Sequence, residues 1–160
     1  MSSDTRTSGI TGARKTEQAG TESGGTEPQA VTATTYNILI VDDSATTRAM
    51  IKRTLRLTGL PVSEIYEAGS GAEGLDMLRS HAVGLVLADL NMPVMSGAEM
   101  TRRIRHDEQT KDVPVVVVSA EPDDGRLRQL QCEGVSAYVR KPFTPEAIRD
   151  AVQNAMEGAR

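Results

Sequence analysis

The sequence of 160 residues has a single cysteine, Cys132, and no apolar run long enough to cross a membrane. One cysteine excludes an internal disulfide and any zinc cluster built from cysteines, and we expect Cys132 to be a small, half-buried side chain on a helix. The longest apolar runs, such as Val113–Val118, fall far short of the ~20 residues that a membrane span requires. Nothing near Met1 resembles the apolar core of a signal peptide. We therefore expect a soluble protein of the cytoplasm with no membrane insertion.

Concentrated positive charge is also missing. The net charge is -4 and the Lys and Arg residues are scattered, so no basic stripe is present that would hold a phosphate backbone. We expect no nucleic-acid partner. No Gly-rich fingerprint follows the first apolar segment, which argues against dinucleotide binding.

Residues 1–35 are rich in Ser, Thr and Gly and contain almost no large apolar side chain. Such a segment cannot recover the entropy that is lost on ordering, so we expect a disordered tail. The remaining length suits one domain of common size, which we place at residues 36–160.

From Tyr36 onward, five apolar segments alternate with five amphipathic helical patterns. The predicted strands are residues 36–41, 63–68, 85–88, 114–118 and 137–140. The predicted helices begin after Ser44, at Gly69-Ser70, and at residues 98, 124 and 145. The first helix is expected to place Met50, Ile51, Thr54, Leu55 and Thr58 on one buried face.

Alternating strands and helices imply a parallel sheet that is covered on both faces, because each crossover needs a helix of its own. We therefore predict an α/β, flavodoxin-like, doubly wound fold: a five-stranded parallel sheet of order 2-1-3-4-5 with five helices. The switch point of this topology lies between the first and third strands.

Acidic residues follow both of those strands. Asp42 and Asp43 come after the first, and Asp89 comes at the end of the third. The loops after the first, third, fourth and fifth strands open on one edge, so these acids should converge with Ser119 and Lys141. Clustered carboxylates raise one another's pKa values unless a cation neutralises them, and hard oxygen ligands favour Mg²⁺ over zinc.

Such a site suits phosphoryl transfer to a carboxylate. We expect Asp89 to be the nucleophile, with the metal ion and Lys141 neutralising the phosphoryl oxygens and Ser119 donating a hydrogen bond.

Four motifs, in this order and spacing, resemble the signature set of response regulator receiver domains of two-component systems, in particular the single-domain chemotaxis type. They are Val41-Asp42-Asp43-Ser44, Asp89-Leu90-Asn91-Met92-Pro93, Ser119-Ala120 and Lys141-Pro142-Phe143.

The resemblance implies that Asp89 is the phosphoacceptor and receives its phosphoryl group from the phosphohistidine of a sensor histidine kinase. It implies that Mg²⁺ is held directly by Asp43, Asp89 and the backbone carbonyl of Asn91, and by Asp42 mostly through water.

The same resemblance assigns phosphoryl binding to Ser119 and Lys141, and it implies a cis Lys141-Pro142 peptide. Tyr138 matches the aromatic that turns inward as Ser119 moves toward the phosphate. Together they would couple the site to the surface of the fourth helix, fifth strand and fifth helix. The alternative for Tyr138 is an aromatic that merely packs on an edge strand.

Asn91 and Glu121 occupy positions that tune the lifetime of the acyl phosphate in the family. A Mg²⁺-dependent aspartyl phosphohydrolase is an alternative, but such enzymes need an acid two residues after the nucleophile, where this chain has Asn91. A phosphorylation-independent interaction module would predict a broken site, whereas every chemical group is present. We therefore expect a signalling phosphoacceptor that catalyses only its own phosphorylation and dephosphorylation.

No second domain follows, so we expect a stand-alone regulator whose output is binding to another protein. The first candidate is a flagellar motor switch or similar target in bacterial chemotaxis. The alternative is a phosphorelay shuttle that passes its phosphoryl group to a histidine phosphotransfer protein.

Overall fold

The computed structural model describes residues 35–120 and 123–158, which belong to one compact unit. The predicted tail, residues 1–35, lies outside the described residues except for Thr35. Among the helices of the described ranges, none combines the length and apolar character that a membrane span needs.

A parallel sheet of five strands forms the centre of this unit. Its spatial order confirms the predicted 2-1-3-4-5 topology: β4 (Val62–Ala68), β3 (Tyr36–Val41), β5 (Leu85–Asp89), β6 (Val115–Ser119) and β7 (Ala137–Arg140). The register places Val41 beside Ala88 and Asp89 beside Val118. The carboxyl ends of β3, β5 and β6 are therefore level with one another.

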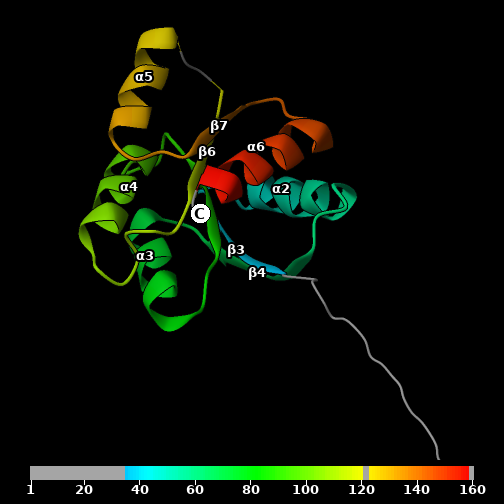
Figure 1. Ribbon diagram of the computed structural model, residues 1–160, viewed down its shortest axis with the longest axis horizontal. Coiled ribbons are helices and arrows are strands. Elements are labelled where there is room, and N and C mark those ends of the chain that lie inside the picture. Colours follow the sequence, from blue (N-terminus) through cyan, green and yellow to red (C-terminus); the bar gives the residue numbers. More distant parts are fainter. Residues whose placement is uncertain (1–34, 121–122, 159–160) are drawn as a thin grey trace, which may run out of the picture. The chain divides into compact units, whose positions relative to one another are not determined.

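Helices cover both faces of the sheet, as predicted (Figure 1). The helices α2 (Ala45–Leu57) and α6 (Pro145–Gly158) lie on one face. The other face carries α3 (Gly71–Ser80), α4 (Gly97–His106) and α5 (Asp124–Cys132). The observed helix starts and strand bounds differ from the predicted ones by at most two residues, and capping side chains mark the helix starts.

Each helix begins at a side chain that accepts a hydrogen bond from a backbone N–H of the first turn. A cap of this kind contributes about 1 kcal/mol to helix stability. The capping residues are Ser44, Ser70, Ser96, Asp123 and Thr144.

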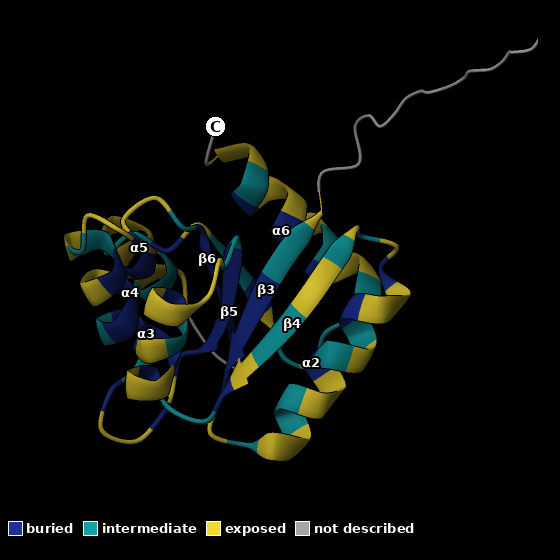
Figure 2. Cartoon of the chain, turned by 90° about the horizontal axis from the view of Figure 1, so that it is seen from below, coloured by how far each residue is buried: buried dark blue, intermediate teal, exposed yellow. Residues whose placement is uncertain are grey.

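The sheet is most deeply buried at its centre. Every residue of β5 and β6 is buried, whereas β4 at the edge is largely exposed or half-buried (Figure 2). Successive side chains of a strand point to opposite faces of the sheet. Ile38 and Ile40 accordingly pack toward α2 and α6, and Leu39 and Val41 pack toward α3 and α4.

Two predictions about individual side chains were wrong. Met50 was expected on the buried face of the first helix, but it is 55% exposed. The buried face of α2 runs through Ile51, Leu55 and Thr58, and successive helical residues are rotated by roughly 100°, which turns Met50 away from the sheet. Cys132 was expected to be half-buried and is exposed at the end of α5.

Candidate functional site

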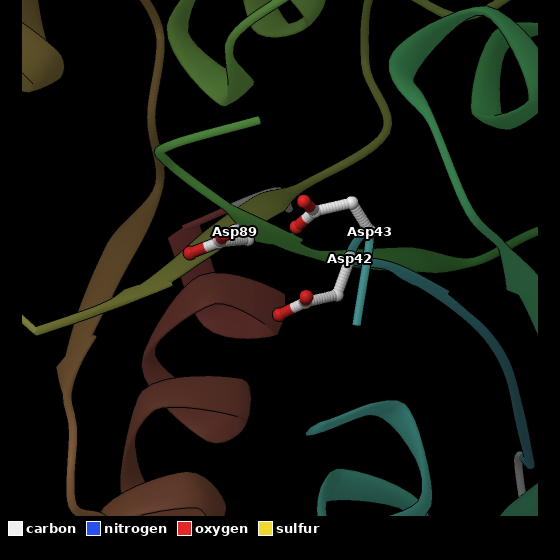
Figure 3. A group of neighbouring side chains, drawn as sticks. All are labelled: Asp42, Asp43 and Asp89. Carbon is white, nitrogen blue, oxygen red and sulfur yellow. The ribbon is translucent and has the colours of Figure 1, made fainter. Parts of the chain in front are cut away.

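Three carboxylates meet at the carboxyl edge of the sheet. Asp42 and Asp43 directly follow β3, and Asp89 is the last residue of the neighbouring strand β5. Each offers an oxygen that lies within 4.8 Å of the oxygens of the other two. Figure 3 shows the three side chains gathered at the ends of these strands. The structure thus brings together the acids that the sequence pattern selected, and this cluster could hold a metal ion.

The three acids differ in burial. Asp42 is 1% exposed and Asp89 is 8% exposed, whereas Asp43 is exposed. The Asp42 side chain is fixed from its own loop, because its Oδ1 accepts a hydrogen bond of 2.8 Å from the backbone N–H of Ser44. The cluster therefore has a fixed, buried floor formed by Asp42 and an open side formed by Asp43.

Lys141 brings a positive charge to the two buried acids. Its Nζ lies 3.4 Å from Asp89 Oδ1 and 3.5 Å from Asp42 Oδ2. The backbone N–H of Lys141 donates to the carbonyl oxygen of Ser119, at 2.8 Å, which ties the loop after β7 to the end of β6. The Lys141-Pro142 peptide is cis, which confirms the expectation from the motif. One ammonium facing three carboxylates leaves the site with excess negative charge.

The environment raises the pKa of the Asp89 carboxyl above its ordinary value. Burial is the largest cause, and the charge of Asp42 acts in the same direction. Lys141 opposes both effects by its charge and its hydrogen bond. Asp89 is thus an acid whose ionised form is poorly solvated, and a cation or a covalent modification that removes its charge would relieve this cost.

This raised pKa predicts a pH-dependent free energy of unfolding. The folded protein binds the Asp89 proton more tightly than the unfolded chain, in which the ordinary pKa is 3.8. The contribution of the protonated Asp89 carboxyl to the free energy of unfolding is therefore fully present below pH 3.8, and it is lost as the pH rises through the pKa of Asp89 in the folded protein. At neutral pH the ionised carboxylate destabilises the fold, so Asp89→Asn should unfold at higher urea concentration than the wild type.

Urea unfolding of both proteins at a series of pH values checks this. The advantage of Asp89→Asn should shrink toward acidic pH, because protonation then removes the charge from the wild type as well. A constant difference at all pH values would contradict the assignment of the effect to ionisation.

Ser119 ends β6 beside the acid cluster. Its side chain is buried, and Oγ is one of the few buried side-chain atoms of the described residues without a hydrogen-bond partner. A buried hydroxyl without a partner is unfavourable by about 1–3 kcal/mol, so this position suits a ligand that accepts a hydrogen bond.

Tyr138 is linked to Ser119 by a hydrogen bond to the Ser119 backbone. Its Oη donates a hydrogen bond of 2.8 Å to the carbonyl oxygen of Ser119. The ring is half-buried and packs on an apolar cluster of Leu90, Ala98, Val117, Leu130 and Val135. The tyrosine therefore links the end of β6 to the packing between β7 and α5.

Of the two remaining predicted residues, the structure describes only Asn91, which lies at the rim. Asn91 is exposed in the loop after Asp89, and that loop is closed by a hydrogen bond of 2.9 Å from the N–H of Gly97 to the carbonyl of Leu90. Glu121 lies outside the described residues.

Sequence reasoning did not single out Arg48, which also reaches the site. Its Nη1 donates to the backbone carbonyl oxygen of Asp42 at 2.5 Å. The signal was available in principle, since Arg48 follows the cap Ser44 by four residues and so lies one turn along the same helical face.

Comparison with known proteins identifies the family. Residues 38–153 match the response regulator receiver domain. The chain belongs to this family. A chemotaxis protein CheY of Pseudomonas aeruginosa is 38% identical over 120 residues, which cover 75% of this chain and 95% of that protein. A CheY homolog of Campylobacter jejuni is 33% identical over 120 residues, covering 74% of this chain and 91% of that protein.

Solved structures agree with this assignment. The chemotaxis response regulator CheY4 of Vibrio cholerae matches with a TM-score of 0.68 and 30% sequence identity, covering 76% of this chain and 99% of that one. The protein is thus a receiver domain of the CheY type, consistent with chemotaxis signalling, and such domains are signalling proteins rather than classical enzymes. The family goes against the phosphohydrolase alternative.

Proposed function

We propose that this receiver domain is the phosphoacceptor of a cytoplasmic response regulator and that Asp89 receives the phosphoryl group from the phosphohistidine of a sensor histidine kinase. The observation that carries the proposal is the convergence on one buried carboxylate, Asp89, of two further acids and a lysine ammonium, with a buried hydroxyl without a partner, that of Ser119, at the end of the neighbouring strand. This combination supplies a nucleophile, acids that can hold a cation, and an ammonium and a hydroxyl that can contact a dianionic phosphoryl group.

The acids fit a divalent cation with hard oxygen ligands. Asp43 and Asp89 would hold Mg²⁺ directly together with the backbone carbonyl of Asn91, and Asp42 would act through water. An ion held by these residues would neutralise negative charge on the phosphoryl oxygens. The excess of carboxylates over the single lysine supports this assignment, because the lysine alone does not balance the cluster.

In the transfer step, a carboxylate oxygen of Asp89 attacks phosphorus and forms a P–O bond while the P–N bond to the kinase imidazole breaks. The imidazole nitrogen leaves with the electron pair and can then take up a proton. Lys141, which lies between Asp42 and Asp89, turns its ammonium to a phosphoryl oxygen, and the Ser119 hydroxyl donates a hydrogen bond to another. Hydrolysis returns Asp89 and inorganic phosphate, and Asn91 and Glu121 set the lifetime of the acyl phosphate.

The signalling output is a change in the surface that binds a protein target. As the Ser119 hydroxyl moves to the phosphoryl group, the carbonyl that Tyr138 holds moves with it, and the ring turns inward. This movement alters the surface of α5, β7 and α6, which then binds a protein target and neither nucleic acid nor membrane. The chemotaxis names of the relatives favour a motor switch protein over the alternative, a histidine phosphotransfer protein in a phosphorelay.

Labelling with a small acyl-phosphate donor tests the proposal. The protein incubated with Mg²⁺ and acetyl phosphate should gain the mass of one phosphoryl group, and the label should be lost on mild acid or base treatment. Chelation of the metal with EDTA should reduce labelling at least about tenfold, since a metal ion contributes several kcal/mol to such transfers. Restoring excess Mg²⁺ is the control. Absence of any labelling of the wild type would contradict the proposed function.

A further inference from the structure

Arg48 links the acid cluster to the edge strand of the sheet. Its guanidinium donates through Nη1 to the backbone carbonyl oxygen of Asp42, at 2.5 Å, and through Nε to Glu67 Oε1 on β4, at 3.1 Å. The side chain is only 18% exposed. The proposed transfer step does not use this basic group.

The Asp42 carbonyl lies where the sheet can no longer supply a partner. The pairing of β3 with β4 ends at Val41 and Ala68, and the last hydrogen bond in that direction uses the N–H of Asp42, not its carbonyl. Asp42 is buried, so its carbonyl oxygen needs another donor. Arg48 supplies that donor from the first turns of α2.

The Arg48 guanidinium is held in its orientation by Glu67. Glu67 accepts from Arg48 with Oε1, and its other oxygen, Oε2, lies 2.6 Å from Nζ of Lys52. These two cations hold the pKa of the Glu67 carboxyl below its ordinary value, with the hydrogen bond from Lys52 as the largest cause. A charged carboxylate with two partners thus fixes the plane in which Arg48 reaches toward Asp42.

The three acids of the cluster are not held equally well. The Asp42 side chain contacts the N–H of Ser44 and the ammonium of Lys141, and Asp89 contacts the same ammonium. Within the described residues, no group donates a hydrogen bond to the Asp43 side chain. The structure therefore holds Asp43 only through its backbone, which sets the direction of its Cα–Cβ bond, beginning with the peptide plane that contains the Asp42 carbonyl.

We infer that Arg48 is a positioning residue for the metal site: by holding the Asp42 carbonyl, it fixes the peptide between Asp42 and Asp43 and so aims the Asp43 carboxylate. This inference rests on the proposed function, in which Asp43 is a direct ligand of Mg²⁺. If Arg48 acted through its charge alone, its removal would increase the Mg²⁺ affinity rather than lower it, because removing a positive charge near three carboxylates would strengthen the binding of a cation.

Isothermal titration of the full-length chain with Mg²⁺ tests the inference. Arg48→Met keeps the aliphatic stem and should weaken Mg²⁺ binding by about tenfold, the effect expected for loss of one charge-assisted hydrogen bond. Lys52→Met is the matched control: it removes a neighbouring cation that also pairs with Glu67 but does not touch Asp42. Its Mg²⁺ affinity should stay within about twofold of the wild type.

Labelling by acetyl phosphate gives a second readout. In Arg48→Met the Mg²⁺ concentration for half-maximal labelling should rise about tenfold, while the rate at saturating Mg²⁺ changes by less than about threefold. Glu67→Asp retains Arg48 and the negative charge but shortens the side chain that orients the guanidinium, and it should shift the Mg²⁺ requirement in the same direction by a smaller factor. This variant keeps the test valid even if Arg48→Met folds poorly.

The outcomes separate this inference from the proposed function. If the wild type binds Mg²⁺ but does not label, and Arg48→Met still weakens binding, the positioning role stands and the phosphoacceptor role falls. If the wild type labels, and Arg48→Met binds Mg²⁺ as well as or better than Lys52→Met, the positioning role is overturned. A wild type that binds no Mg²⁺ overturns it as well.

Discussion

Replacing Asp89 with asparagine is expected to reduce the incorporation of acid-labile phosphate by at least about 10³-fold, because the amide has no anionic oxygen to attack phosphorus. The change is nearly isosteric, and it removes a charge that burial already disfavours. The fold should therefore persist and even gain stability at neutral pH. Intact mass after incubation with Mg²⁺ and acetyl phosphate measures the loss, and peptide mapping of the wild type should locate the label at residue 89.

Asp43→Asn is the matched control for this experiment. It removes one carboxylate of the same cluster but leaves the nucleophile and its contact with Lys141 in place. This variant should still label when the Mg²⁺ concentration is raised, whereas Asp89→Asn should not label at any Mg²⁺ concentration. Equal labelling of Asp89→Asn and the wild type would show that another residue accepts the phosphoryl group.

Replacing Gly97 with alanine is expected to destabilise the protein by about 3 kcal/mol, through a collision that no side-chain movement can relieve. A Cβ at this position would lie far inside van der Waals distance of the Asp89 carbonyl oxygen and 3.1 Å from the Asp89 carbonyl carbon. The atoms that it meets belong to the backbone of Asp89 and of Leu90. To accommodate the methyl group, either the first turn of α4 or the end of β5 at Asp89 must shift.

Gly125→Ala, in α5, is the control for this second prediction. A Cβ there would meet nothing nearer than 3.5 Å, and alanine favours a helix over glycine by up to about 1 kcal/mol. Urea unfolding should therefore show a marked loss of stability for Gly97→Ala and no loss for Gly125→Ala. If both variants unfold at the midpoint of the wild type, the close approach of Gly97 to Asp89 is not present in solution.

The fold was predictable because its determinants are local. Alternating apolar segments and helical patterns predicted five strands and five helices, and side chains such as Ser44 and Thr144 marked where helices begin. Connections that must be right-handed then left few topologies, and the observed strand order agrees with the predicted one. The error at Met50 has the same origin: the apolar pattern identifies a helical face but locates its edge only to within one residue.

The convergence of the site also followed from topology. Asp42, Asp43 and Asp89 end adjacent parallel strands, so the sequence order and the strand order together place them side by side. The difference between buried Asp42 and exposed Asp43 could not be predicted in this way. It depends on how tightly α2 and the loop after β7 close over the strand ends.

The sequence by itself therefore determined the elements, their order and the residue types at the carboxyl edge of the sheet, because hydrophobic periodicity and capping act over a few residues. Tertiary structure alone decided which groups touch there. The ammonium of Lys141 reaches Asp42 across 99 positions of the chain. Arg48 reaches the carbonyl of Asp42 in an orientation fixed by Glu67 on another strand. Distances of this kind depend on the packing of whole helices against the sheet, and no local pattern of the sequence encodes them.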